Sequence, residues 1–182
     1  MSPDSWDWLA NGLSWSGAPI DASFRPPGLP LVIAALHRLG VLNALPILNF
    51  AMLALAAALL YRWIRLRHSA VVAALACLLF VSNGSLFGYV RFVMAEVWTL
   101  PFLVAAAIAF TRAAARPRAY ITCGLLLGES FLFHYAGAIV ALAMAAALLF
   151  HRRADLRSRW PWLGLLSAMP LPAIWLVLRA QH

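Results

Sequence analysis

The chain has 182 residues, of which 64% are hydrophobic and 11% charged, and its mean hydropathy is +0.85. Soluble proteins carry about 25% charged residues, so this composition excludes an ordinary soluble domain and predicts an all-α, polytopic helical membrane protein. The formal net charge of +8 comes entirely from arginine, because lysine is absent. Most of these arginines form three short clusters between apolar runs, which is typical of cytoplasmic loops and argues against a nucleic-acid partner. The clusters are Arg62, Arg65 and Arg67; Arg112, Arg116 and Arg118; and Arg152, Arg153, Arg157 and Arg159.

Residues 1–43 differ from the rest of the chain, because acids and aromatic residues alternate there. We interpret this stretch as an outer loop that ends in an interfacial helix over Pro27–Arg38, which is too short to cross a bilayer and starts at a double proline. Residues 44–182 would then form one transmembrane bundle. No signal peptide is recognised at Met1, since a polar, acidic segment follows it.

Long apolar runs predict the first three spans. The run Ala44–Ile64 crosses from outside to inside and ends at the first arginine cluster. Two further spans, Ala70–Tyr89 and Phe92–Thr111, fit between the first and second clusters. As an alternative, the polar sequence SNGS at 82–85 ends the earlier of these two spans and widens the outer turn.

The 32 residues of Ala119–Phe150 lie between two clusters that belong on the same side of the membrane. Two full spans need about 40 residues, so we predict a hairpin of two short helices whose tip, FLFHYAG, stops inside the membrane. One long tilted helix is the alternative, but it would place the third arginine cluster on the outer side of the membrane, against the charge rule. The final span, Pro161–Leu178, contains two prolines and is expected to be kinked. About six spans result.

In this topology several ionisable residues gather at the outer face. They are Asp4, Asp7, Asp21, Arg25, Arg91, Glu96 and His134. Transfer of a sugar from a lipid phosphate to a hydroxyl needs a carboxylate that accepts the hydroxyl proton and cations that stabilise the departing phosphate. The chain contains both kinds of group.

Each of these residues also has a plainer interpretation. Asp4 and Asp7 are as well explained as solvated charges on a frayed terminus, and arginines near head groups are usually anchors. His134 at the hairpin tip is more often a buried, satisfied histidine than a catalyst. Glu96 is a stronger candidate because acids inside spans are rare, and Glu129 follows it with the alternative of pairing with another helix.

The segments DSWDWLANGL, FRPPGLPLVIAALHRLG, MAEVWTLPFLVAAAIAF and GLLLGESFLFHYAGAIVALAMAAALL occur in this order. Together they resemble the N-terminal half of the GT-C superfamily of membrane glycosyltransferases. The most similar groups are the dolichyl-phosphate-mannose protein mannosyltransferases and the bacterial aminoarabinose transferase and Rgt-like enzymes. The most specific local match is PPGLPL at Pro26–Leu31, where the family has PPGYPL.

This resemblance implies a glycosyltransferase of the bacterial inner membrane that takes sugar from a polyprenyl phosphate at the periplasmic face. Asp4 corresponds to the family's loop acid, with Asp7 as the fallback, and Glu96 to an acid that opens a later span. His134 and Tyr135 stand where many relatives have a cation followed by Tyr or Pro, which implies phosphate contacts together with Arg25 and Arg91. A divalent metal is possible but no site for it is identified.

The family has a span immediately before the loop acid and more spans after the region matched here, so we expect the chain to be a fragment or a truncated reading frame. The competing hypothesis is a non-catalytic membrane protein, such as a transporter fragment or an assembly partner, with Glu96 and Glu129 along a pathway. The sequence does not identify the sugar or the acceptor.

Overall fold

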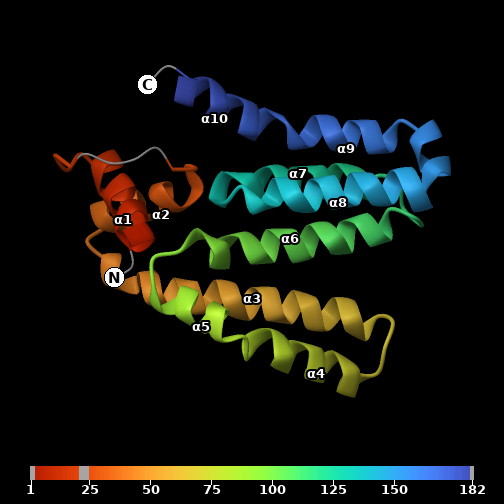
Figure 1. Ribbon diagram of the computed structural model, residues 1–182, viewed down its shortest axis with the longest axis horizontal. Coiled ribbons are helices and arrows are strands. Elements are labelled where there is room, and N and C mark those ends of the chain that lie inside the picture. Colours follow the sequence, from red (N-terminus) through yellow and green to blue (C-terminus); the bar gives the residue numbers. More distant parts are fainter. Residues whose placement is uncertain (1–2, 21–24, 181–182) are drawn as a thin grey trace. The chain divides into compact units, whose positions relative to one another are not determined.

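The structure is a computed structural model that describes residues 3–20 and 25–180 (Figure 1). The described residues form helices and turns and no strand, which confirms the all-α prediction. They divide into two compact units, Met1–Pro101 and Phe102–His182, and the division falls inside one helix, α6. Each unit is described separately below.

The first unit begins with two short helices, α1 (Pro3–Trp15) and α2 (Gly28–Arg38). The second matches the short helix expected after the double proline, and its interfacial position stays a prediction. It ends at Arg38, two residues before Gly40, whose φ of 70° favours glycine. The first was not expected, because the sequence analysis treated everything before Pro27 as an outer loop. Its acid in the first turn suits the positive end of the helix dipole.

The two helices run in the same direction and pack closely. Near their starts, Arg25 meets two acids of α1, and near their ends the Arg38 guanidinium donates to the Trp15 carbonyl at 3.1 Å. Between these points Gly12 lies directly against Ile33, because a Cβ at position 12 would collide with that side chain. Ile33 is fully buried. Glycine at this position therefore sets the distance between α1 and α2.

A one-turn 3₁₀ helix, η1 (Leu42–Ala44), leads into the long apolar helix α3 (Leu45–Arg65), which reproduces the predicted first span to within a residue. The first arginine cluster lies at the end of α3 and in the turn after it, and helix α4 (Ala70–Val81) then returns beside α3 (Figure 1). The predicted span Ala70–Tyr89 is not continuous. Asn83 caps a new helix, α5 (Gly84–Arg91), by accepting a hydrogen bond from the Ser85 amide at 3.0 Å.

The alternative in which SNGS ends the earlier span is therefore the correct one. Asparagine and serine bond to nearby backbone groups and so interrupt a helix that apolar residues would otherwise continue. The next helix, α6 (Ala95–Arg112), starts after a short turn and agrees with the predicted span Phe92–Thr111 within three residues.

Asn49 fastens this turn to α3. Its Nδ2 donates to the carbonyls of Val90 and Phe92, each at 3.1 Å, and its Oδ1 accepts from the Trp98 indole at 2.8 Å. The Asn49 residue is only 2% exposed. One buried amide thus joins α3 to the end of α5 and the start of α6.

The second unit contains the rest of α6, then α7 (Ala119–Phe133) and α8 (Ala136–His151). At 1.5 Å per residue these two helices measure only about 22 and 24 Å, which confirms the predicted hairpin of short helices. A 3₁₀ segment, η2 (Arg153–Arg157), leads to α9 (Trp160–Ala168) and α10 (Pro170–Ala180). The break between the last two falls at Pro170, where a kink was predicted, because proline lacks an amide N–H.

Small residues determine the packing of α7 against α9. A Cβ at Gly124 would collide with the Gly164 carbonyl, and one at Gly128 would lie 2.7 Å from the Ala168 carbonyl oxygen. Such small-xxx-small spacing lets helix backbones touch inside a membrane. Behind this contact, Ala106 and Ala109 of α6 and Cys123 of α7 form an apolar core.

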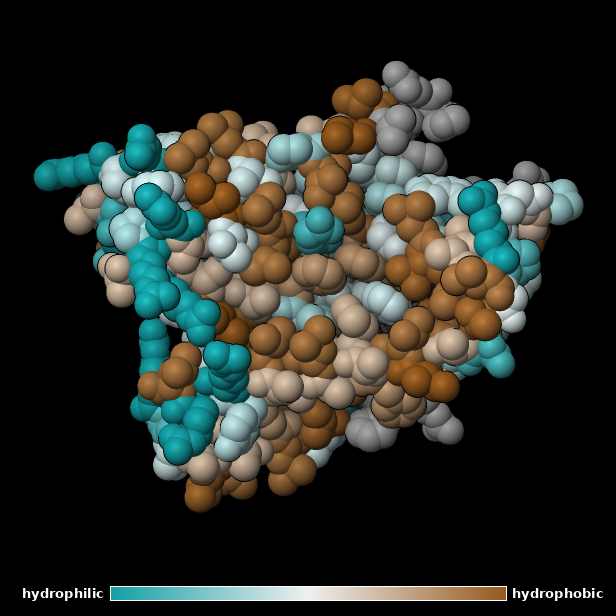
Figure 2. Space-filling view, turned by 180° about the vertical axis from the view of Figure 1, so that it is seen from behind, coloured by the Kyte–Doolittle hydropathy of each residue, from teal (hydrophilic) through white to brown (hydrophobic). Residues whose placement is uncertain are grey.

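Within the described residues, three helical segments are long and apolar enough to cross a membrane: Leu42–Arg65, Ala95–Arg112 and Trp160–Val177, the last of which includes the break at Pro170. The helices α4, α7 and α8 are apolar but shorter. Apolar residues cover most of the face shown in Figure 2, and most of the strongly hydrophilic ones lie toward its edges. This distribution is expected of helices whose sides face lipid.

Candidate functional site

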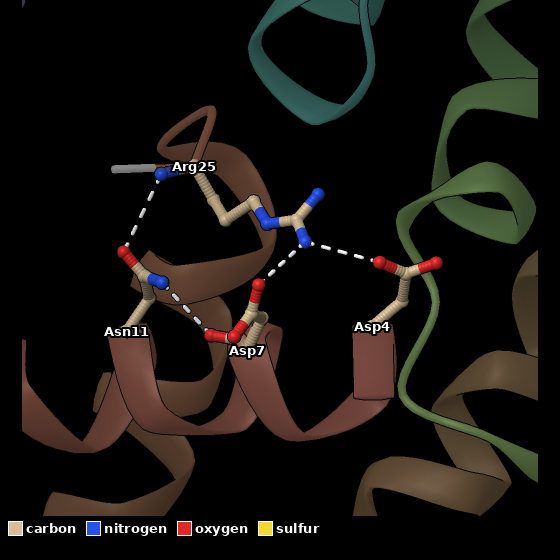
Figure 3. Close-up of polar contacts among 4 residues, drawn as sticks. All are labelled: Asp4, Asp7, Asn11 and Arg25. Carbon is tan, nitrogen blue, oxygen red and sulfur yellow. Dashed lines mark hydrogen bonds and ion pairs between the residues drawn. The ribbon is translucent and has the colours of Figure 1, made fainter. Parts of the chain in front are cut away.

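The acids of the N-terminal segment lie on one face of α1. Asp4 and Asp7 are three residues apart, so a helix brings both to the same side. Arg25, just before α2, reaches between them: its Nη2 lies 3.1 Å from Asp4 Oδ1 and 2.6 Å from Asp7 Oδ2 (Figure 3). Two candidate catalytic acids and one candidate phosphate-binding residue, predicted separately, therefore form one cluster.

Two further residues of α1 hold Arg25 in place. Asn11, one turn beyond Asp7, accepts from the Arg25 backbone amide at 3.4 Å and donates to the Asp7 carbonyl at 2.8 Å (Figure 3). The Arg25 guanidinium also lies over the Trp8 indole, 5.4 Å from the ring centroid. Both Trp8 and Asn11 are almost fully buried. The cluster therefore rests on a packed support instead of a frayed terminus.

Burial acts to lower the pKa of Arg25, but hydrogen bonds and attraction from Asp7 and Asp4 outweigh it and raise the pKa above its ordinary value. Arg25 is therefore a permanent cation. Its side chain is 30% exposed, whereas Asp7 is 40% and Asp4 63% exposed. Because solvent screens such pairs, the cluster contributes geometry and charge more than stability.

The pairing leaves reactive atoms available. Asp4 contacts Arg25 through Oδ1, and its second oxygen, Oδ2, accepts no hydrogen bond from the described residues. In the same part of the structure, Nη1 of Arg25 donates to no described group. One exposed proton acceptor and one cationic donor thus stand side by side. A base and an anion contact are the two functions that this arrangement supplies.

Glu96 also belongs to the first unit, in the first turn of α6, where it is half-buried. Ala95 and Val97 on either side are fully buried, and the Asn49 hydrogen bonds fix the turn that precedes them. Arg91 ends α5 close to this turn, but its side chain lies outside the described residues, as does Asp21. The structure thus places Glu96 on a different helix from the Asp4–Asp7–Arg25 cluster.

His134 and Tyr135 belong to the second unit, at the tip of the hairpin. His134 Nδ1 accepts a hydrogen bond from the Ala136 amide at 3.1 Å, so the imidazole caps the start of α8. The Tyr135 ring makes an edge contact with Phe131, with ring centroids 5.4 Å apart. A structural task for His134 agrees with its plainer interpretation, and a phosphate contact there stays a prediction.

The sequence analysis missed Asn11 and Asn49, which position the turns around the candidate residues. Asn11 had a detectable signal, since it follows Asp4 and Asp7 at helical spacing, but α1 itself was not anticipated. Asn49 had only its polarity within an apolar run. Within the described ranges, no three His, Cys, Asp or Glu side chains gather as a metal site would require.

Comparison with protein families gives a match between residues 24–177 and the model described as dolichyl-phosphate-mannose-protein mannosyltransferase. The match includes Arg25, Glu96, His134 and the whole hairpin, whereas Asp4 and Asp7 precede it. No curated protein and no solved structure matches the chain significantly. Since the family model covers most of the chain, the chain belongs to the dolichyl-phosphate-mannose-protein mannosyltransferase family, within the GT-C membrane glycosyltransferases.

Proposed function

We propose that the chain is part of an enzyme that transfers a sugar from a polyprenyl phosphate to an acceptor hydroxyl at the periplasmic face of a bacterial inner membrane. Membership of a membrane glycosyltransferase family gives the general reaction. The observation that carries the specific form is the Asp4–Asp7–Arg25 cluster, which joins an exposed carboxylate to a permanent cation.

In the proposed reaction the acceptor oxygen attacks the anomeric carbon of the sugar while its proton passes to Asp4 Oδ2. The bond from the anomeric carbon to the phosphate oxygen breaks, and the polyprenyl phosphate leaves with the electron pair. This single displacement inverts the anomeric configuration. Arg25 Nη1 contacts a phosphate oxygen, where a cation stabilises the developing charge.

The remaining residues have supporting tasks in this proposal. Asp7 keeps Arg25 in place, since it makes the shorter of the two ion pairs, and is the fallback base. Glu96 positions the acceptor or a divalent metal. Arg91 provides a further contact to the phosphate, and the phosphate contacts that the resemblance implies for His134 and Tyr135 stay predictions.

Sugar transfer from a radiolabelled polyprenyl-phosphate donor tests the proposal, in membranes that contain the full-length gene product. A positioned base contributes about 10²- to 10⁴-fold, so Asp4→Asn is expected to reduce turnover by at least a hundredfold. Asp155→Asn, the same chemical change in η2, is the matched control and should retain most of the activity. Unchanged turnover in Asp4→Asn removes Asp4 from the reaction.

Arg25 is tested by comparing lysine with glutamine. Lysine keeps the charge but not the fork that spans two carboxylates, whereas glutamine removes both. We expect Arg25→Gln to lose more activity than Arg25→Lys, and both to raise KM for the lipid donor. Equal, full activity in the two variants contradicts a phosphate contact at Arg25.

The membrane side is tested with an impermeant thiol reagent, in a background without Cys77 and Cys123. A cysteine at Leu39, exposed after α2, should be labelled from the periplasm, and one at His68, in the turn between α3 and α4, should not. The reverse labelling pattern contradicts the proposed orientation.

A further inference from the structure

A basic pocket lies at the arginine-rich end of the second unit. None of its lining residues has a role in the proposed reaction. It has a volume of about 440 Å³ and is lined by Arg116, Pro117, Arg118 and Trp160. The first three residues come from the turn between α6 and α7, and Trp160 opens α9. Two segments far apart in the sequence thus build one pocket.

Arginines surround the indole that forms one wall of this pocket. The guanidinium of Arg118 lies 5.7 Å from the Trp160 ring centroid, and that of Arg159 lies 5.1 Å from it. Stacking on the indole holds both cations close to the same wall. Arg116 adds a third charge on the pocket lining.

These cations are not neutralised by nearby acids. The segments between α6 and α7 and between α8 and α9 carry six arginines and one acid, Asp155. That acid is already used, because its Oδ2 lies 3.2 Å from Arg152 Nε and accepts from the Tyr120 hydroxyl at 2.6 Å. Among the described residues, Arg116, Arg118 and Arg159 have no carboxylate partner.

Arg118 and Arg159 also occupy electrostatically unfavourable positions. They are the residues that precede the first turns of α7 and α9, and neither helix start has a side-chain cap. A cation there opposes the helix dipole. Membrane topology explains why arginines occur in these turns, but it does not explain why two of them line one pocket while a third stacks on the indole that forms its wall. A bound anion would relieve the repulsion.

A second cavity, which is apolar, is lined in part by residues that closely follow those of the basic pocket in the sequence. It has a volume of about 100 Å³ and is lined mainly by side chains of α7, α8 and α9. Pro161, the residue after Trp160, and Tyr120, two residues after Arg118, are part of its lining. The starts of α7 and α9 therefore contribute residues both to the cationic pocket and to the apolar cavity. A phosphate joined to an alkyl chain matches this pair.

We propose that this pocket binds an anionic glycerophospholipid. Arg116 and Arg118 hold its phosphate, and Arg159, stacked on the Trp160 indole, adds positive charge. The indole lies at the head-group level, and a section of one acyl chain occupies the apolar cavity. Basic pockets between membrane helices are suited to such head groups. The site shares no residue with the Asp4–Asp7–Arg25 cluster, so its test is independent of catalysis.

The complete protein, purified in a mild detergent, is titrated with dioleoyl phosphatidylglycerol, with dioleoyl phosphatidylcholine and with inorganic phosphate, and bound lipid is counted by native mass spectrometry. We expect the anionic lipid to bind at least tenfold more tightly than the neutral one, which has the same chains. Equal binding of the two lipids, or displacement of the lipid by millimolar inorganic phosphate, overturns the proposal.

Two variants with the same change in charge distinguish lipid binding at the pocket from nonspecific attraction of anionic lipid to a positively charged protein. The pocket variant replaces Arg116, Arg118 and Arg159 with glutamine and should lose at least tenfold in affinity for phosphatidylglycerol. The control variant replaces Arg62, Arg65 and Arg67, the cluster between α3 and α4, and should stay within twofold of the unaltered protein. Equal losses refute a built site.

Single substitutions keep the test decisive if the triple pocket variant does not fold. Arg159→Gln should weaken binding at least threefold, and an unchanged affinity counts against the pocket. For the acyl chain, Ala141→Leu narrows the cavity and should weaken binding, whereas Ala143→Leu, on the same helix but outside the cavity lining, should not. Equal binding of these two variants refutes the placement of the chain.

Discussion

Replacing Asn49 with leucine should destabilise the first unit more than any other single polar-to-apolar change in α3. Leucine preserves the approximate volume but removes three hydrogen bonds, one from the Trp98 indole at 2.8 Å and two to the carbonyls of Val90 and Phe92 at 3.1 Å. Each such bond contributes about 1 kcal/mol, and stranded buried partners cost more. We therefore expect a loss of about 3 kcal/mol in the free energy of unfolding.

Detergent-denaturant titration of the purified protein, followed by circular dichroism, measures this loss. Asn43→Ala is the matched control, since Asn43 is exposed in η1 and should change stability by less than about 0.5 kcal/mol. Asn49→Asp keeps an acceptor for Trp98 but turns a carboxylate oxygen toward two carbonyls, so it should be at least as harmful as leucine.

A double-mutant cycle with Trp98→Phe isolates the indole bond. The coupling between positions 49 and 98 should be about 1 kcal/mol. A loss below about 0.5 kcal/mol for Asn49→Leu, no larger than in the control, would refute the view that this amide holds the turn before Glu96.

Substitutions test three further contacts. Gly124→Val should disrupt the approach of α7 to α9 and lower the free energy of unfolding by more than about 2 kcal/mol, as overpacking does. Gly88→Ala is the control, because a Cβ there meets no neighbouring atom, and it should be neutral or stabilising. Equal effects of the two substitutions in an unfolding titration would contradict the close packing of α7 and α9. Tyr120→Phe removes the 2.6 Å hydrogen bond to Asp155 and should cost about 1 kcal/mol, and an unchanged unfolding midpoint would show that the bond contributes nothing. Gly12→Val should separate α1 from α2 and make α1 more sensitive to limited proteolysis; an unaltered digestion pattern would show that the two helices do not need this glycine.

Apolar periodicity and charge were sufficient to predict most of the membrane region. The boundaries of α3, α6 and the α7–α8 hairpin follow from run lengths between arginine clusters, because a helix in lipid must satisfy its own backbone and needs a defined length to cross. The break in the last helix follows from Pro170, a local property. These features depend on residues close together in the chain, so the sequence alone specifies them.

The candidate site was only partly predictable. The sequence identified Asp4, Asp7 and Arg25 as separate candidates, but it did not predict α1, since an acid- and tryptophan-bearing stretch resembles an interfacial loop. Helix α1 is stabilised by contact with α2 through Gly12. That contact is tertiary, and no local pattern encodes it.

The sequence by itself determined the class of protein, the family and the residue types available for chemistry, because composition, arginine placement and motif order are properties of the linear chain. Only the tertiary structure decided which groups meet. It joined Asp4 and Asp7 through Arg25, tied Asn49 to two helices, gave His134 a capping task, and brought Arg118 and Arg159 onto Trp160. The reason is physical: hydrogen bonds and ion pairs need distances of a few ångströms, and helix packing alone brings distant residues that close.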